Sequence, residues 1–380
     1  MRKTVYWIEG DGIGPEIWQA ARPVIEGAIR AAGADLTLDW VELLAGDKAV
    51  KETGHPLPDA TLEALRHAEL AMKGPLGTPV GTGMRSLNVA LRQTLDLYAC
   101  IRPVRHFEGL ETPVKHPERV NMVIFRENTE DVYAGVEFAA NTPEARKLVA
   151  FLRDELGVTK VNDNAAVGIK PMTEAGSKRL VRRALRFALD QKQQSLTLVH
   201  KGNIMKFTEG AFRQWGYDVA AQEFGDLTCT EKEPVAGKLV VKDRIADAMF
   251  QEALLRPEQY QILATPNLNG DYISDALAAQ VGGLGLAPGV NMSDILAFYE
   301  ATHGTAPTIA GKDKANPGSV ILCGALMLEH IGVPKAAERI RSAVSKAIAA
   351  KAVTEDLAAQ VPGSRAVGCV EFGEIIGANL

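Results

Sequence analysis

Short apolar runs alternate with helix-like periodicity along most of this chain of 380 residues. Runs of strand length occupy residues 4–8, 70–73, 122–125, 196–199 and 261–264. Apolar residues three and four positions apart predict helices over residues 60–66, 175–188, 246–255 and 336–350. Strands that alternate with helices in this way predict an α/β fold with a largely parallel sheet.

The first predicted strand is followed by a glycine-rich turn, Gly10-Asp-Gly-Ile-Gly14, and then by Pro15. A helix is expected to begin here, because proline is tolerated at the first helical position. The turn has the spacing G-x-G-x-G, whereas a dinucleotide-binding fingerprint has G-x-G-x-x-G and an acidic residue about 20 positions further on. Only Asp35 approaches that position. A tight strand-to-helix turn is therefore favoured over a Rossmann phosphate loop.

Composition narrows the class of protein. Hydrophobic residues make up 46% and charged residues 23%, as in ordinary globular proteins, and the length predicts two or three domains. The net charge of −5 argues against a nucleic-acid binder. The cysteines are too far apart for zinc ligation and are expected to be buried thiols: Cys100, Cys229, Cys323 and Cys369. Without a secretory leader or an apolar run of ~20 residues, a cytoplasmic enzyme is expected.

Several arginines lie near one another or at the ends of apolar runs. Arg92, Arg102 and Arg105 fall within residues 83–105, and Arg126 directly follows the run 122–125. A planar guanidinium suits a carboxylate through two hydrogen bonds. Converging arginines therefore indicate an anionic substrate with more than one carboxylate or phosphate. The alternative is a set of structural ion pairs.

Two carboxylates, Asp271 and Asp275, are four residues apart, so a helix would place both on one face. Like charges at that spacing repel each other by about 0.2–0.5 kcal/mol. A divalent cation would offset the repulsion, and carboxylate oxygens suit Mg²⁺ or Mn²⁺. The alternative is that Asp271 caps the helix and Asp275 is merely exposed.

Two further residues are candidates for acid–base chemistry. Lys201 follows the apolar run 196–199, and a lysine at the edge of a low-dielectric site can transfer protons. Tyr133 lies in the segment Glu130-Asp-Val-Tyr-Ala-Gly135. Without other information, a surface lysine and a core tyrosine are the ordinary expectations.

The stretch from Glu300 to Ser319 is rich in Gly, Pro, Thr and Ala, and reads Glu-Ala-Thr-His-Gly-Thr-Ala-Pro-Thr-Ile-Ala-Gly-Lys-Asp-Lys-Ala-Asn-Pro-Gly-Ser. This composition predicts a long ordered loop before a helix, where the backbone can approach a ligand. The stretch closely resembles the adenosine-binding loop of the isocitrate dehydrogenases, which are metal-dependent β-decarboxylating dehydrogenases. The turn at Gly10 also resembles this family, and the resemblance extends to Phe372.

The resemblance implies a doubly wound sheet that is not a Rossmann fold. The implied large, cofactor-binding domain comprises residues 1–97 and 282–380. The small domain, for substrate, metal and dimer contacts, comprises residues 98–130 and 174–281, and a clasp segment for dimerisation comprises residues 131–173. The implied assembly is a homodimer whose active sites are shared between the subunits.

The resemblance also assigns roles to the candidate residues. Ser86 and Asn88 match residues that bind the γ-carboxylate of isocitrate. The other carboxylates would be bound by Arg92, Arg102 and Arg126, the metal by Asp247, Asp271 and Asp275, and protons would be transferred by Tyr133 and Lys201. Of these, Asp247 and Lys201 would serve the site of the partner subunit.

The implied cofactor residues are Thr78, Gln251, Arg256, Glu300, His303, Gly304, Thr305, Ala306, Thr308, Ile309, Asn316 and Glu355. In the family the histidine stacks near the adenine. NADP-using relatives place Lys-Tyr where this chain has Thr308-Ile309, and the acidic Glu355 would repel a 2′-phosphate. Arg256 is the exception, since it matches an arginine that touches that phosphate. NAD is therefore the predicted cofactor, with NADP as the alternative.

The implied reaction is the oxidative decarboxylation of isocitrate to 2-oxoglutarate and CO₂ with Mg²⁺ or Mn²⁺. A sister dehydrogenase for homoisocitrate or isopropylmalate is one alternative. The polar pair Ser86 and Asn88 argues against isopropylmalate, which needs an apolar pocket. A non-catalytic regulatory subunit is another alternative. It is opposed by the presence of both acid–base residues and all three metal-site aspartates.

Overall fold

The computed structural model describes residues 1–77 and 86–380 of the chain. In these residues eleven strands form one sheet: β1 (Arg2–Ile8), β2 (Thr37–Glu42), β3 (Leu70–Lys73), β4 (Ala99–Arg105), β5 (Asn121–Glu127), β8 (Ser195–His200), β9 (Thr228–Thr230), β10 (Leu239–Ile245), β11 (Ile262–Thr265), β12 (Pro288–Met292) and β13 (Ala297–Ala301). Their order is β2-β1-β3-β13-β12-β4-β5-β11-β8-β10-β9. Each of the five apolar runs named above is a strand of this sheet.

The sheet consists of two parallel blocks with an antiparallel centre. Strands β2, β1, β3 and β13 pair in parallel, as do β5, β11, β8, β10 and β9. Between the blocks, β12 is antiparallel to β13 and β4, and β4 is antiparallel to β5. The link between β12 and β13 is only residues 293–296, which suits an antiparallel pair. The predicted α/β fold and largely parallel sheet are confirmed.

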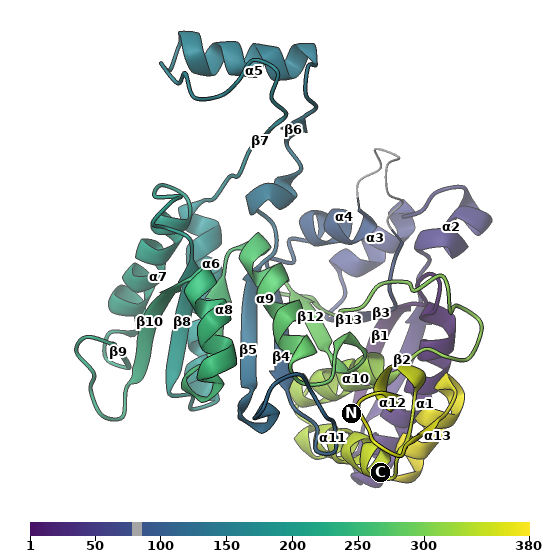
Figure 1. The fold of residues 1–380 in the computed structure, drawn as a ribbon. Coiled ribbons are helices and arrows are strands. Elements are labelled where there is room, and N and C mark those ends of the chain that lie inside the picture. Colours follow the sequence, from purple (N-terminus) through teal and green to yellow (C-terminus); the bar gives the residue numbers. More distant parts are fainter. Residues whose placement is uncertain (78–85) are drawn as a thin grey trace.

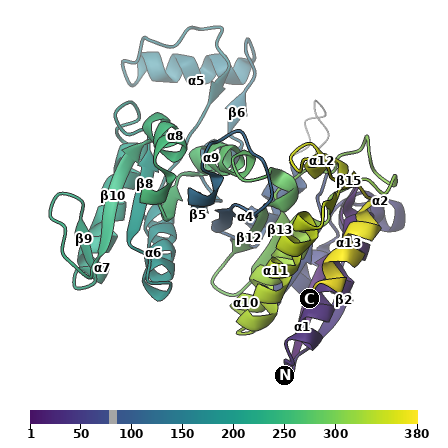
Figure 2. The same cartoon turned by 60° about the horizontal axis from the view of Figure 1, so that its bottom comes forward.

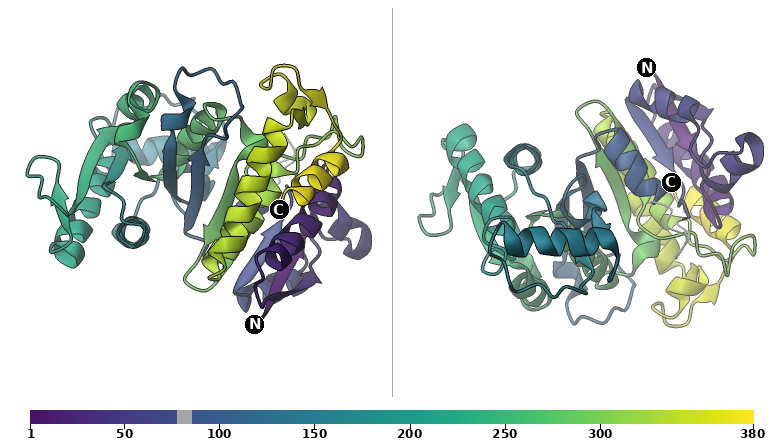
Figure 3. Two further views of the ribbon diagram at one scale, coloured as in Figure 1. Left: turned by 90° about the horizontal axis from the view of Figure 1, so that it is seen from below. Right: turned by 90° about the horizontal axis from the view of Figure 1, so that it is seen from above.

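Helices cover both faces of the sheet (Figures 2 and 3). They are α1 (Gly14–Ala31), α2 (Gly46–Thr53), α3 (Asp59–Arg66), α4 (Leu87–Thr94), α6 (Glu174–Asp190), α7 (Glu209–Phe224), α8 (Ala246–Leu255), α9 (Asn267–Ala279), α10 (Gly318–His330), α11 (Pro334–Ala349), α12 (Glu355–Ala358) and α13 (Cys369–Ala378). The helices predicted from periodicity are α3, α6, α8 and α11. Pro15 lies in the first turn of α1, as expected.

One segment stands apart from the sheet (Figure 1). It contains the 3₁₀ turn η2 (Asp131–Ala134), β6 (Glu137–Phe138), α5 (Pro143–Asp154) and β7 (Val167–Gly168), and β6 pairs antiparallel with β7. Large apolar side chains are exposed on it, including Phe151 and Leu156. Its residues fall within 131–173, and the role of that segment as a clasp for dimerisation stays a prediction. The division of the remaining chain into two domains stays a prediction, since one sheet crosses the proposed boundary.

Two details complete the fold. Thr228–Thr230 form the edge strand β9, which pairs with β10 and matches none of the apolar runs named above. Cys100, Cys323 and Cys369 are free and buried, as predicted, whereas Cys229 is partly exposed. Within the described ranges, no helix has both the length and the apolar character needed to cross a membrane.

Candidate active site

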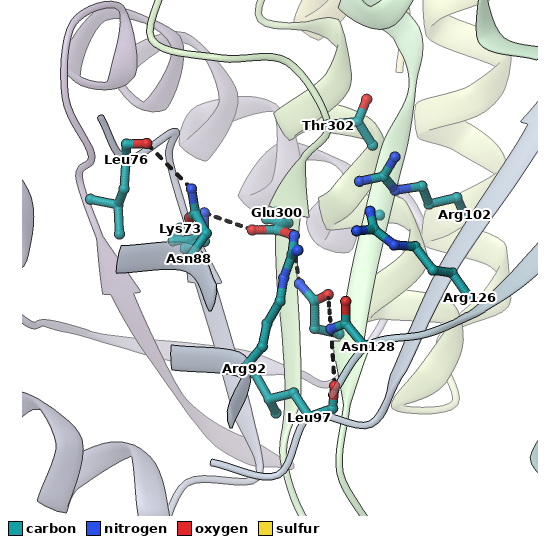
Figure 4. A network of polar contacts seen from close by, with 12 residues as sticks. Lys73, Leu76, Asn88, Arg92, Leu97, Arg102, Arg126, Asn128, Glu300 and Thr302 are labelled. Carbon is teal, nitrogen blue, oxygen red and sulfur yellow. Dashed lines mark hydrogen bonds and ion pairs between the residues drawn. The ribbon is translucent and has the colours of Figure 1, made fainter. Parts of the chain in front are cut away.

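Arg102 and Arg126 lie on neighbouring antiparallel strands at the centre of the sheet. Arg102 is opposite Ile124 and Arg126 is opposite Cys100, so strand alternation places both side chains on one face. Figure 4 shows them side by side. Their exposed fractions are only 7% and 1%. Helix α9 packs on this face, and a Cβ at Gly270 would lie 2.7 Å from the Arg126 side chain, so a glycine is required there.

Helix α9 brings Asp271 and Asp275 to the two arginines, so the condition under which both carboxylates share one helical face is met. Arg126 forms an ion pair with Asp271, and Nη1 of Arg102 lies 3.0 Å from Oδ1 of Asp275. Burial acts to raise the pKa of Asp271, but Arg126 and the Tyr133 hydroxyl bring it below its usual value. Burial raises the pKa of Asp275 in spite of Arg102. Two carboxylates thus face two guanidinium groups.

Arg92 belongs to a buried network with Glu300 on β13 (Figure 4). Its Nη2 donates to Oε1 of Glu300 at 2.7 Å, Lys73 contacts Oε2 at 2.6 Å, and Asn291 donates to Oε1 at 2.7 Å. Burial acts to raise the pKa of Glu300, but Lys73 and Arg92 hold it well below the usual range. Both oxygens of Glu300, a predicted cofactor residue, are therefore already bonded inside the protein.

Each arginine of the arginine cluster (Arg92, Arg102 and Arg126) has one buried nitrogen atom for which the described residues supply no acceptor. Nε of Arg92, Nε of Arg102 and Nη2 of Arg126 are buried and have no partner among the described residues, and neither has Oδ1 of Asn88. Ser86 occupies the N-cap position of α4, and Nδ2 of Asn88 donates to the Leu76 carbonyl at 3.3 Å. Buried polar atoms normally have partners. Three cationic donors without one point to a ligand that carries several acceptor oxygens.

Tyr133 lies in η2, beside the arginine cluster. Its hydroxyl donates to Oδ2 of Asp271 at 2.5 Å, and the guanidinium of Arg126 lies 4.9 Å from its ring centre. Burial and the hydrogen bond to Asp271 raise the pKa of Tyr133 to about 12. The hydroxyl is therefore protonated at neutral pH and can act as a proton donor.

Lys201 and Asp247 pair with each other, and this ion pair lowers the pKa of Asp247. Across residues 1–77 and 86–380, no three His, Cys, Asp or Glu side chains gather in an arrangement that could hold a metal ion. The oxygen donors Asp271 and Asp275 fit Mg²⁺ or Mn²⁺ by chemistry. The predicted third ligand, Asp247, could complete the set only from a second copy of the chain.

The loop of residues 302–317 lies against the turn at residues 10–14. The amide of Ile13 donates to the Thr305 carbonyl at 3.0 Å, and a Cβ at Gly12 would lie 2.1 Å from that carbonyl oxygen. Gly12 also has a φ of +60°. The glycine-rich turn therefore supports the loop by close backbone contact.

A pocket of about 590 Å³ adjoins this loop. It is lined by Ile13, Gly285, His303, Gly304, Ala306, Ile309, Lys314, Ala315, Asn316, Glu355 and Asp356. Six predicted cofactor residues are among them. Burial lowers the pKa of His303, and its buried Nε2 has no partner in the part of the chain that the structure describes. The pocket is therefore the candidate site for the adenosine part of a dinucleotide.

The other predicted cofactor residues lie elsewhere. Thr305 and Thr308 belong to the same loop but do not line the pocket. Gln251 and Arg256 lie on the exposed side and end of α8, where Arg256 contacts Glu252. Thr78 lies outside the described residues.

Sequence reasoning missed Lys314. Its ammonium lies 2.9 Å from Oε2 of Glu355, and both residues line the pocket. The carboxylate that was expected to repel a 2′-phosphate thus has a cation beside it. Since Lys314 is six positions from Thr308, comparing only residues 308 and 309 could not reveal it. The signal was present in the motif Lys312-Asp-Lys314 of the same loop.

A second cavity, of about 970 Å³, is separate from these sites. It is lined by Ile101, Val123 and Phe125, which alternate along β4 and β5 with Arg102, Ile124 and Arg126. The cavity therefore lies on the opposite face of the sheet. Arg105, one of the arginines expected to converge on a substrate, lines this cavity and so lies on the opposite face of the sheet from Arg102 and Arg126. The lining includes none of Arg92, Arg102, Arg126, Asp271, Asp275, Tyr133 and Lys201.

Comparison with known proteins identifies the family. A model described as isocitrate/isopropylmalate dehydrogenase matches residues 4–376. The chain belongs to this family. Isocitrate dehydrogenase [NADP] of Pseudomonas aeruginosa (strain UCBPP-PA14) is 54% identical over 98% of this chain and 92% of the relative. The Coxiella burnetii protein of the same name is 52% identical over 99% and 91%.

Solved structures agree with this assignment to the isocitrate/isopropylmalate dehydrogenase family. The crystal structure of isocitrate dehydrogenase from Methylococcus capsulatus has a TM-score of 0.82 and 40% identity, and 99% of each chain is covered. The TT0538 protein from Thermus thermophilus has a TM-score of 0.80 and 33% identity over 100% of this chain and 68% of that chain. The predicted resemblance and the predicted fold are confirmed.

The cofactor prediction needs correction. The relatives from Pseudomonas, Staphylococcus and Coxiella are all named isocitrate dehydrogenase [NADP]. The prediction of an NAD-dependent enzyme, with NADP less favoured, is therefore wrong. Its weak step was to treat Glu355 as an unpaired negative charge, because Lys314 accompanies that carboxylate.

Proposed function

We propose that this chain catalyses the oxidative decarboxylation of isocitrate to 2-oxoglutarate and CO₂ with reduction of NADP. The observation that carries the substrate is the arginine cluster, with its three buried and unpartnered nitrogen atoms. A tricarboxylate supplies enough acceptor oxygens for these donors. Ser86 and Asn88, on the first turn of α4, are proposed to bind the γ-carboxylate.

When bound at Asp271 and Asp275, a divalent cation would supply Lewis acidity, and NADP would supply the hydride acceptor. Lys201 accepts the proton of the C2 hydroxyl. Loss of CO₂ from the resulting β-keto acid leaves an enolate, and Tyr133 donates a proton to its C3. The raised pKa of Tyr133 keeps the donor protonated, and Asp271 orients its hydroxyl.

A homodimer is part of this proposal. Apolar side chains are exposed on α8 and α9 and in the segment after Lys201, including Leu254, Leu255, Tyr272 and Phe207, which is 93% exposed. Exposed apolar side chains gathered on one surface are typical of protein interfaces. A second copy on this surface would bring its Asp247 and Lys201 to Asp271 and Asp275, and so complete the metal site.

The choice of NADP rests on the relatives' names and on Lys314. An ammonium group beside the adenosine pocket can donate to a 2′-phosphate. The predicted role of Arg256 is kept as a second phosphate contact that would come from the partner subunit.

Steady-state kinetics test the proposal. We expect kcat/KM for isocitrate with Mg²⁺ to be higher with NADP than with NAD, and chelation of the cation to abolish turnover. Homoisocitrate and isopropylmalate are the control substrates. A higher kcat/KM for either control acid would contradict the substrate, and a higher value with NAD would contradict the cofactor.

A further inference from the structure

A buried ionic cluster lies next to the candidate active site and comprises Asp131, Lys170 and Glu209. The ammonium of Lys170 lies 2.5 Å from Oδ1 of Asp131 and 2.9 Å from Oε1 of Glu209. Both carboxylates are only 1% exposed. Burial of two carboxylates around one ammonium is unfavourable unless other donors compensate. The other hydrogen-bond donors to each carboxylate therefore identify the chain segments that the cluster fixes in place.

Glu209 holds the Lys201 segment. It is the first residue of α7, and its Oε2 accepts the backbone N–H of Lys201 at 2.5 Å. The same oxygen accepts Nδ2 of Asn269 at 2.8 Å. Asn269 is two residues before Asp271 on α9. One carboxylate oxygen thus fixes the backbone of the proposed proton acceptor against the helix that carries the metal-site aspartates.

Asp131 holds the Tyr133 segment. Its Oδ1 accepts the N–H of Val132 at 2.7 Å, and its Oδ2 accepts the N–H of Leu268 at 3.1 Å, in the first turn of α9. Asp131 has a φ of +70°, a region that few residues other than glycine adopt. This conformation aims its carboxylate at the N-terminus of α9 and turns the chain into η2. The helix dipole adds to the stabilisation there.

Lys170 connects these two contacts and lies two residues after β7, where the chain returns from the protruding segment. Near the base of that segment, Asp131 N–H donates to the Pro171 carbonyl at 2.9 Å. Three separate stretches of chain, around Lys201, around Tyr133 and at the start of α9, therefore meet at one ion cluster.

We propose that this ionic cluster positions the two proton-transfer groups of the proposed reaction, with Glu209 setting Lys201 and Asp131 setting Tyr133. The inference rests on the proposed function. Glu209, Asp131 and Lys170 are positioning residues, because the carboxylates act through the backbone of the segments that carry Lys201 and Tyr133, and Lys170 acts through the carboxylates. Each carboxylate is assigned to a different step, so the two can be tested apart.

The first test is Glu209→Gln. The amide keeps the volume and one oxygen for the Lys201 N–H, but it presents an NH₂ group to the ammonium of Lys170. A misplacement of about 1 Å is expected to lower kcat for isocitrate oxidation roughly 100-fold. KM for isocitrate should change little, since the arginines are untouched, and deuterium at C2 should slow the variant more than the wild type. Decarboxylation of added oxalosuccinate should be largely retained.

The second test is Asp131→Asn, which tolerates the positive φ. Here decarboxylation of oxalosuccinate should fall, whereas its reduction to isocitrate, which depends on Lys201, should be largely retained. The matched control is Glu223→Gln on the same helix as Glu209. It removes an ion pair with Arg182 far from the site. The control should resemble the wild type in both partial reactions.

The inference is supported if Glu209→Gln mainly loses isocitrate oxidation and Asp131→Asn mainly loses oxalosuccinate decarboxylation. Equal loss of both partial reactions, or activity equal to the control, overturns it. Amide hydrogen exchange of residues 200–206 needs no substrate and should be faster in Glu209→Gln than in Glu223→Gln. If the wild type is inactive but exchange is still faster in Glu209→Gln, the proposed function is contradicted, whereas the positioning of Lys201 by Glu209 is supported. Unchanged exchange would contradict that positioning.

Discussion

The arginine cluster and the candidate adenosine pocket are both proposed to bind anionic groups, but they are built from different kinds of backbone. Arg102 and Arg126 project from central strands and are buried, with α9 packed over them. The charged pair of the pocket, Lys314 and Glu355, comes from a loop and a short helix, and its side chains are half exposed. The two arginines are thus part of the folded core, whereas Lys314 and Glu355 can be substituted without disturbing the core.

Replacing Arg126 by Met tests the core side of this comparison most severely. The change removes a proposed substrate contact and leaves Asp271 without its closest counter-charge. Loss of one partner of a buried ion pair costs roughly 3–5 kcal/mol of stability, so urea unfolding should shift to lower concentration. Because a proposed substrate contact is lost as well, kcat/KM should fall up to about 10⁴-fold. Arg182→Met, which breaks an ion pair on α6, is the control. Unchanged stability would show that the cluster is less integrated into the fold than the structure indicates.

Tyr133→Phe separates chemistry from packing within the same region. The ring remains under Arg126, so stability should change little, while the hydroxyl that donates to Asp271 is lost. Turnover of isocitrate should fall about 10²- to 10³-fold, the usual contribution of a general acid. Reduction of oxalosuccinate should persist in a stopped-flow assay. Full turnover by this variant would remove Tyr133 as the proton donor.

Lys314→Met tests the pocket formed by the loop of residues 302–317. KM for NADP should rise about tenfold, because a charge-assisted contact to the 2′-phosphate is lost. The thermal midpoint and KM for NAD should stay near the wild-type values. Lys346→Met, which removes another exposed lysine on α11, is the matched control. If KM for NADP does not change, the phosphate is held elsewhere and the two regions differ less than proposed.

Glu300→Gln asks to which region that residue belongs. In the folded protein the pKa of Glu300 is held well below normal, so its ionised form adds stability above pH ~4.3 that is lost as the pH falls. The free energy of unfolding, measured by urea titration from pH 5.5 to 3.5, should fall more steeply for the wild type than for the variant. The extra loss should be about 1 kcal/mol at pH 3.5. Parallel slopes would mean that Glu300 is not ionised within the arginine network.

Elements with strong local patterns were predictable from the sequence. The run 70–73 is strand β3 and the periodicity of residues 246–255 is helix α8, with the same limits in both cases. The short strand β9 was missed because Thr228–Thr230 is too brief to show alternation. The antiparallel centre was not predicted either, since β4 and β12 are far apart in sequence and pair only through the tertiary fold.

The candidate site shows the same division. Arg102, Arg126, Asp271 and Asp275 were found because their spacing or position was unusual, and the structure brings them together. Lys314 was missed because only residues 308 and 309 of its loop were compared, and Glu209 because a single glutamate carries no signal until its partner is known. Glu355 was misjudged for the same reason. A charge can be read from a sequence, but its neutralising partner 41 positions away cannot.

The order of strands in the sheet also sets an order of assembly during synthesis. Strands β5, β8, β9, β10 and β11 lie between residues 121 and 265, so this block can pair before the last third of the chain has been made. Strands β1, β2 and β3 are made first, but β3 has its inner neighbour only when β13, residues 297–301, leaves the ribosome. The N-terminal block therefore waits with one strand edge open. We expect nascent chains that stop before residue 297 to be the ones that most need protection from aggregation.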